Sequence, residues 1–202
     1  MLLKNDGLLP LDRQKIKRIA VIGGNADSVP MLVGNYNGTP THPSTILKGI
    51  HQLLDGTRGR DGARIQIIAV TNMPFALPNR AAPVTDFSAA IAAAKSADVV
   101  IYAGGLDATL EREEKKGLAM QGFSGGDRTA IELPQTPDDL LRALHATGKP
   151  VVFVNCSGSA IAMPWAKKTC RQFCRRGIPA SPAGGPSRKF CSGSRTRAAN
   201  CP

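Results

Sequence analysis

The stretch DVVIYAGGLDATLEREEKKGLAMQGFSGGDR, residues 98–128, decides the fold and places its chemistry. From Val99 to Ala103 it is apolar at consecutive positions, as in a strand that helices cover on both faces. Glycines, clustered glutamates and an Asp-Arg pair come after that strand, so we expect them at its C-terminal end. Ligands of open α/β sheets bind at that end. The sequence therefore predicts a candidate site between residues 104 and 128.

Three carboxylates of this stretch, Glu111, Glu113 and Glu114, fall within four positions. Repulsion between them should raise the pKa of at least one, and a general acid needs a raised pKa. The alternative is a solvated loop, since acidic runs on loops commonly do no more than face water. Spacing alone leaves both interpretations open.

Predicted strands and helices alternate through the rest of the first 165 residues. We expect strands at 19–22, 65–70 and 151–154, and helices that begin after Ser44, at Asp86 and at Thr136. The helix at 86–97 leads straight into the strand at 98–103, which forms a βαβ unit and hence a parallel pair. This order predicts an α/β fold with a doubly wound, mostly parallel sheet between helices, incomplete at its C-terminal end.

The net charge of +11 is carried by one end of the chain. Residues 166–202 hold nine Lys and Arg and no acid, whereas the first 165 residues hold 17 basic and 15 acidic residues. Four of the five cysteines lie in the same basic stretch. We therefore predict two parts, a nearly neutral domain at 1–165 and a basic, disordered tail at 166–202.

Other familiar motifs are incomplete. The turn at Gly23 and Gly24 lacks the G-x-G-x-x-G spacing of a dinucleotide site, and His42 has no neighbours at metal-ligand spacing. The segment after Val154 is not a nucleophile elbow. The cysteine spacings that begin at Cys170 and Cys174 fit no standard zinc finger. We expect no cofactor and no metal.

The N-terminus has no basic segment followed by an apolar one, so we see no signal peptide in this chain. Apolar runs are also too short for a membrane span, which needs about 20 residues. We expect no membrane partner, and the location of the protein in the cell stays open.

Several segments occur in the order found in one enzyme family. Together they resemble the C-terminal α/β sandwich domain of glycoside hydrolase family 3, the β-xylosidase and β-glucosidase group. The matching segments are LLKNDGLLPL (2–11), IAVIGGNAD (19–27), LVGNYNGTP (32–40), AAAKSADVVIYAGG (92–105), LEREE (110–114), GFSGGDR (122–128), ELP (132–134) and ATGKPVVFVNCSGSAIAMPWA (146–166).

The resemblance implies a retaining glycosidase, in which one carboxylate attacks the anomeric carbon and another protonates the leaving oxygen. In the family the attacking aspartate belongs to an N-terminal TIM barrel, which we expect this chain to lack, and the general acid comes from the acidic loop. The matching position is Glu113, with Glu111 and Glu114 as neighbours. The implied partners are a β-xyloside, β-glucoside or oligosaccharide substrate and the missing barrel. The Asp127-Arg128 pair is expected to shape the loop through a salt bridge and not to contact sugar.

The tail departs from the family, and the genetic code offers a reason. When the reading frame is moved one base upstream, the codons of QFCRRGIPAS (172–181) permit AILQAWYPGE, the family's continuation. At three pairs of neighbouring codons, one within this segment and two after it, the moved frame forces leucine, and the family has leucine at each. We infer a shift of reading frame near Lys167 and Lys168. Such a shift also accounts for the basic composition without a nucleic-acid partner.

Two functional classes remain at this stage. The chain is either the general-acid domain of a β-glycosidase, inactive by itself, or a non-catalytic carbohydrate-binding or interaction module that reuses the same fold.

Overall fold

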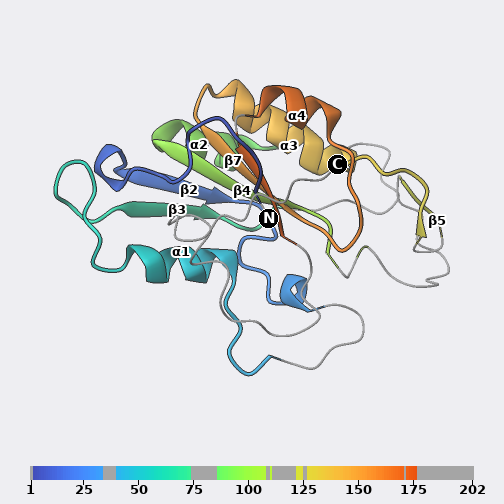
Figure 1. The fold of residues 1–202 in the computed structure, drawn as a ribbon, viewed down its shortest axis with the longest axis horizontal. Coiled ribbons are helices and arrows are strands. Elements are labelled where there is room, and N and C mark those ends of the chain that lie inside the picture. The colour runs from blue at the N-terminus through green and yellow to red at the C-terminus, as the bar shows by residue number, and fades with distance from the viewer. Residues whose placement is uncertain are drawn as a thin grey trace.

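A six-stranded sheet in the order β1-β8-β7-β4-β2-β3 runs through the molecule (Figure 1). The computed structural model describes residues 2–33, 40–73, 86–107, 110, 122–124, 127–170 and 172–176. Strands β3, β2, β4, β7 and β8 pair in parallel, and β1 joins β8 antiparallel. The strands are β1 (Leu2–Asn5), β2 (Arg18–Ile22), β3 (Gln66–Val70), β4 (Val99–Gly105), β7 (Val151–Cys156) and β8 (Gln172–Arg176).

Helices lie on both faces of this sheet. Figure 1 shows α1 on one face and α2, α3 and α4 on the other. Their bounds are α1 (Ile46–Leu54), α2 (Ser88–Ser96), α3 (Gln135–Ala146) and α4 (Pro164–Thr169), with short 3₁₀ turns at Arg13–Lys15 and Pro30–Leu32. The predicted α/β fold, a doubly wound and mostly parallel sheet between helices, is confirmed.

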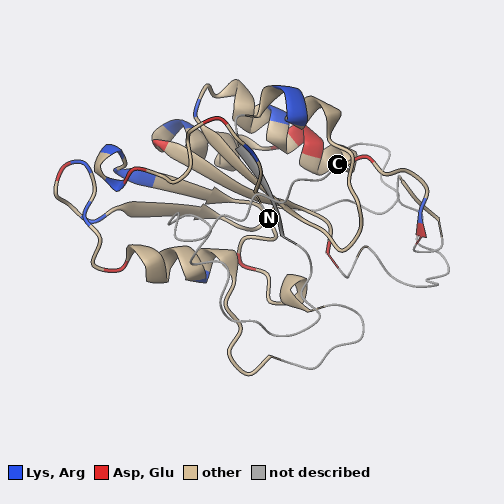
Figure 2. Cartoon of the chain, in the orientation of Figure 1, with Lys and Arg blue, Asp and Glu red and all other residues tan. Residues whose placement is uncertain are grey.

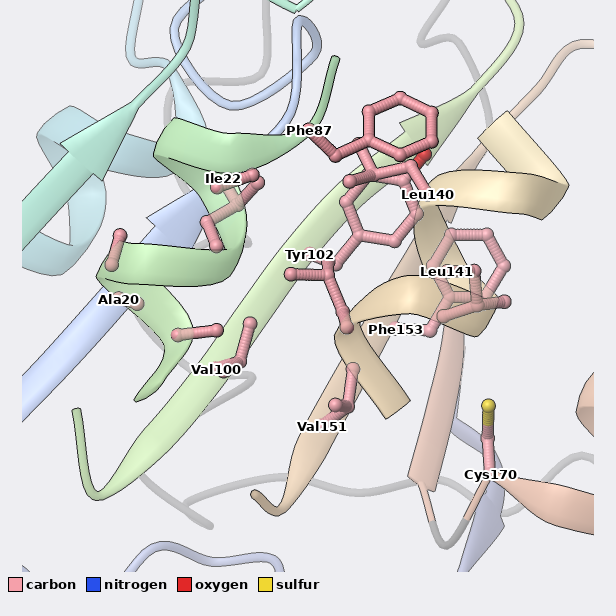
Figure 3. Packing of buried hydrophobic residues seen from close by; sticks show 14 of the residues in the cluster. Ala20, Ile22, Phe87, Val100, Tyr102, Leu140, Leu141, Val151, Phe153 and Cys170 are labelled. Atoms are coloured by element: carbon pink, nitrogen blue, oxygen red, sulfur yellow. The ribbon is translucent and has the colours of Figure 1, made fainter. Parts of the chain in front are cut away.

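Strand β4 is the centre of the hydrophobic core, and each of its residues is buried. Successive side chains enter opposite cores: Val100 and Tyr102 face α2 and α3, and Ile101 faces the side of α1. The ring of Tyr102 stacks on Phe153 of β7 with centroids 5.2 Å apart (Figure 3). Its hydroxyl donates to the carbonyl of Pro137, 3.2 Å away, and burial raises its pKa well above the usual value. The phenol therefore stays neutral and ties β4 to α3.

Helix starts differ from the sequence prediction by one or two residues. Thr45, not Ser44, caps α1: its hydroxyl accepts from the backbone N–H of Lys48 at 3.1 Å and donates to Asp27 at 2.6 Å. Helix α3 begins at Gln135, so Thr136 lies inside its first turn and not at its cap. At α1 the neighbours Ser44 and Thr45 could each take the cap, whereas α3 starts after Pro134 with no side-chain cap.

Part of the predicted tail lies in the sheet. Helix α4 continues past Trp165 to Thr169, and β8 places residues 172–176 between β7 and β1. Residues 177–202 lie outside the described part of the chain. The division at residue 165 stays a prediction. Among the described residues, no helix is long and apolar enough to cross a membrane.

The start of β4 is held to β2 by Asp98. Its carboxylate accepts the backbone N–H groups of Lys17 and Arg18 at 2.7 and 2.8 Å, and Arg60 approaches it at 3.5 Å. Partial burial acts to raise the pKa of Asp98, but the two N–H donors and Arg60 outweigh it and hold the pKa below its usual range.

Replacing Asp98 by Asn should therefore lower the free energy of unfolding at pH 7 by about 1 kcal/mol, because a partly exposed, charge-assisted hydrogen-bond pair is lost. A lowered folded-state pKa contributes stability above the unfolded pKa of about 3.9, and that stability disappears as the pH falls through the folded value. Thermal melts of both proteins from pH 7 to pH 2 should converge at the acid end. A constant difference across that range would contradict this role.

Candidate functional site

The order in which the chain adds parallel strands to the sheet reverses between β2 and β4. Strand β3 lies on one side of β2, and β4, β7 and β8 lie on the other. The loops that leave the carboxyl ends of β2 and β4 therefore diverge, and ligands of this sheet class bind at such a point. The first loop contains Gly23 to Asp27, and the second contains Leu106 and Asp107 before it enters the acidic stretch.

Backbones touch closely at this point, which explains two of the glycines. Gly23 and Gly105 have φ of +110° and +109°. A Cβ added to Gly23 would lie 2.2 Å from the carbonyl oxygen of Ala103, and one added to Gly105 would lie 2.1 Å from that of Cys156. No side chain fits at either position, so both glycines are required by space as well as by backbone angle.

Buried asparagines complete the carboxyl ends of β2 and β7. Asn25 and Asn155 are 0% and 1% exposed. The Asn25 amide donates to the carbonyl of Gly104 at 3.2 Å and so joins the loop after β2 to the end of β4. Within the described residues, the Oδ1 atoms of both side chains are buried without a hydrogen bond. The sequence analysis missed this pair; the one local signal is Asn155, a polar residue directly after the apolar run 151–154.

The three glutamates proposed as catalytic, Glu111, Glu113 and Glu114, lie outside the described residues. The structure does describe the residue before them. Leu110 is 9% exposed and packs in a small cluster with Leu106, Phe123 and Ile161. Its backbone N–H donates to the carbonyl of Asp107 at 3.1 Å. The chain therefore enters the acidic stretch from an anchored position next to the carboxyl end of β4.

Arg128 shapes the far side of the acidic stretch. It belongs to a two-stranded hairpin formed by β5 (Phe123–Ser124) and β6 (Asp127–Arg128). Its guanidinium donates to the carbonyls of Ala130 and Glu132 at 2.6 to 2.9 Å and lies 5.3 Å from the centre of the Phe123 ring. Arg128 thus holds the hairpin through hydrogen bonds to main-chain carbonyls. Phe123, which lies beside the guanidinium, packs in the same cluster as Leu110.

The serine, histidine and cysteine side chains that could serve in catalysis or metal binding lie in environments that do not favour those roles. The Ser157 hydroxyl is buried and donates to the carbonyl of Ser159, and His42 is exposed on a loop. Burial raises the pKa of the Cys170 thiol to about 11, which disfavours the thiolate that a metal ligand requires. The described residues contain no group of three His, Cys, Asp or Glu side chains that could hold a metal ion.

The described residues on either side of the acidic stretch are held by packing and by main-chain contacts. Leu110 and the β5–β6 hairpin fix both ends of residues 111–121, and the glycine contacts fix the strands beneath them.

Residues 1–184 match the Glycosyl hydrolase family 3 C-terminal domain. Among curated relatives, a xylan 1,4-β-xylosidase of Xylanibacter ruminicola is 42% identical over 99 residues, which is 49% of this chain and 11% of that protein. A probable exo-1,4-β-xylosidase of Neosartorya fischeri is 35% identical over 161 residues, covering 80% of this chain and 17% of that protein.

Solved structures agree in fold. A family 3 exo-β-xylosidase in complex with a xylobiose aziridine probe superposes with a TM-score of 0.72 at 29% identity, covering 96% of this chain and 22% of that one. A family 3 β-glucosidase of Bifidobacterium adolescentis gives 0.71 at 28% identity, with 96% and 25% covered. The chain therefore spans about a fifth of the length of such relatives.

Glycines in close backbone contact and glycines in open space should differ in how much a substitution by alanine lowers the free energy of unfolding. Gly105→Ala should lower the free energy of unfolding by about 3 kcal/mol or more, because the strand must both adopt a strained φ and move from Cys156. Gly62 is the matched control, with a φ of +74° and nothing within 4 Å of an added Cβ. Gly62→Ala should cost about 1 kcal/mol from strain alone. Equal losses in urea unfolding of the two variants would contradict the close contact.

Proposed function

Because the chain belongs to the glycosyl hydrolase family 3 C-terminal domain family, we propose that it supplies the proton donor of a retaining β-glycosidase that removes terminal β-xylosyl or β-glucosyl residues. The observation that carries this proposal is the anchored entry of the acidic stretch at Leu110, beside the carboxyl end of β4. That end is where an α/β sheet presents ligand-binding groups. Three glutamates follow within four residues of Leu110.

The proposed chemistry needs two carboxyl groups about 5–5.5 Å apart. A nucleophilic carboxylate attacks the anomeric carbon while Glu113 gives its proton to the leaving oxygen, so the glycosidic bond breaks as the glycosyl-enzyme bond forms. Glu113 then takes a proton from water, and the resulting attack releases the sugar and restores both carboxyl groups. Glu111 and Glu114 are the neighbouring carboxylates of Glu113 in this proposal.

The nucleophile is proposed to belong to a separate barrel domain in the longer polypeptide. The chain spans about a fifth of the length of its relatives, which supports placing the nucleophile and the proton donor in different domains. The names of the curated relatives favour xylosyl substrates over glucosyl ones. The β5–β6 hairpin and Arg128 would position the acid and would not themselves contact the reacting atoms.

The reading-frame shift near Lys167 is part of this proposal. Strand β8 pairs on both sides, with β7 and β1, yet its residues are Gln-Phe-Cys-Arg-Arg. Strands paired on both edges in parallel sheets are normally apolar runs, which the alternative frame would encode.

The 202-residue chain alone should not hydrolyse 4-nitrophenyl β-xyloside between pH 5 and pH 7, because it carries the donor without the attacking group. Release of nitrophenolate above the buffer rate, copurifying with the chain, would place the nucleophile within it. Xylobiose binding by the chain without any turnover in the full-length protein would instead favour the non-catalytic module.

In the full-length protein, Glu113→Gln should reduce kcat for xylobiose by about 10²–10⁴-fold, the usual contribution of general acid catalysis. Dinitrophenyl β-xyloside needs no protonation of its leaving group, so bond cleavage with that substrate should be nearly unchanged in a burst measurement. Glu111→Gln and Glu114→Gln are the matched controls and should reduce kcat less than tenfold. An equal loss on both substrates would argue against proton donation by Glu113.

A further inference from the structure

We infer that Asn25 is a positioning residue for the proton donor. Its amide holds the carbonyl of Gly104 and so sets the direction in which the chain leaves β4 toward the acidic stretch. The inference rests on the proposed function, because it assigns Asn25 a part in that reaction. Asn25 acts through the residues that follow β4 and not by contact with the reacting atoms.

The side chain of Asn25 is placed to donate one hydrogen bond. It is 0% exposed, and its Nδ2 donates to the carbonyl of Gly104 at 3.2 Å. Among the described residues, its Oδ1 is buried without a hydrogen bond. An unpaired buried acceptor destabilises the folded state, so an apolar side chain of the same size would fill this space at lower cost. The donor is therefore what distinguishes Asn25 from a residue that only packs.

The bond to Gly104 begins where the main-chain pairing of β2 with β4 ends. The last paired residues of the two strands are Ile22 and Tyr102, and Gly104 lies two residues farther along β4. The amide of Asn25 therefore stands in for a donor of the β2 main chain. It extends the hold of β2 on β4 up to the point where the chain leaves the sheet.

The turn that carries Asn25 is itself held to α1. The N–H of Leu47 donates to the carbonyl of Ala26 at 2.8 Å. The hydroxyl of the buried Thr45 donates to Asp27 at 2.6 Å. Asn25 thus connects the first turn of α1 with the end of β4, and the position of its amide is fixed from both directions.

On the β7 side, a main-chain hydrogen bond holds the segment that leaves β4. The N–H of Leu106 donates to the carbonyl of Cys156 at 2.7 Å, and Leu106 packs with Leu110 in the small cluster described above. Glu113 is three residues beyond Leu110. Without Asn25 the end of β4 keeps its support from β7 and loses that from β2, so the direction of the following segment is less well defined.

The expected defect has a signature that a loss of stability does not share. A displacement of about 1 Å at a catalytic group lowers a rate by about 100-fold. A displaced proton donor slows only those substrates whose leaving group needs a proton. A variant that is partly unfolded loses active molecules and slows every substrate by the same factor. The ratio of rates on two substrates therefore separates positioning from folding.

The test uses the full-length protein with xylobiose and with dinitrophenyl β-xyloside. Asn25→Ala should lower kcat for xylobiose by about 10- to 100-fold, because the donor is less well placed. The burst rate with dinitrophenyl β-xyloside should stay within about threefold of that of the unaltered protein. Glu113→Gln, measured in parallel, gives the change in the ratio of the two rates when the donor is removed.

Tyr102→Phe is the matched control for stability. It removes a buried hydrogen bond from the same strand, the one from the Tyr102 hydroxyl to the carbonyl of Pro137 at 3.2 Å, and it leaves the end of β4 untouched. The ratio of the two rates should stay within about twofold of that of the unaltered protein.

A second pair of variants keeps the test decisive if Asn25→Ala does not fold. Thr45→Val removes the hydroxyl that holds Asp27 and so loosens the turn that carries Asn25, whereas Thr45→Ser keeps that hydroxyl. Thr45→Val should change the ratio in the same direction by about threefold or more, and Thr45→Ser should leave it nearly unchanged.

Equal losses on both substrates in Asn25→Ala would overturn the inference, and so would a ratio that Tyr102→Phe changes as much. If Asn25→Ala does not fold, equal ratios in Thr45→Val and Thr45→Ser would overturn it. A changed ratio in Glu113→Gln with an unchanged one in Asn25→Ala would overturn the role of Asn25 alone. An unchanged ratio in Glu113→Gln would overturn the proposed proton donor, and the role of Asn25 with it.

Discussion

Close contact between neighbouring backbones at the carboxyl end of the sheet is the constraint on which the rest of the structure depends. Gly23 and Gly105 leave no room for a side chain, so β2, β4 and β7 meet there without an intervening layer. The Asn25 amide crosses the point where the loops diverge. This compact edge gives the acidic stretch a fixed base, because β4 can neither slide nor tilt without breaking those contacts.

A fixed base matters because the proposed activity divides one reaction between two domains. The proton donor must lie within about 5–5.5 Å of a nucleophile that another part of the polypeptide carries. Leu110 and Phe123 anchor the two ends of the donor's segment, and Arg128 holds the hairpin from which Phe123 projects.

Local patterns in the sequence predict the central architecture and fail where tertiary pairing decides. The consecutive apolar residues of β4 and the amphipathic helix patterns around it identify the fold, because a strand covered on both faces is apolar at every position. Strand β8 was not predicted: its two arginines are atypical of a covered strand, and its place depends on pairing with β7 and β1. Asn25 and Asn155 were missed since one polar residue after a strand says nothing of which loops it joins. The assignment of Glu113 rests on resemblance, and its position lies outside the described residues.

The most direct measurement of the central claim is the distance between two carboxyl groups in the full-length protein. A structure of that protein labelled with a xylose-configured aziridine probe would identify the nucleophile by its covalent bond. We predict that the carboxyl group of Glu113 lies about 5–5.5 Å from the labelled carboxylate, as in retaining enzymes. A separation above about 9 Å, or a label on this domain itself, would contradict the assignment of the proton donor to residues 111–114.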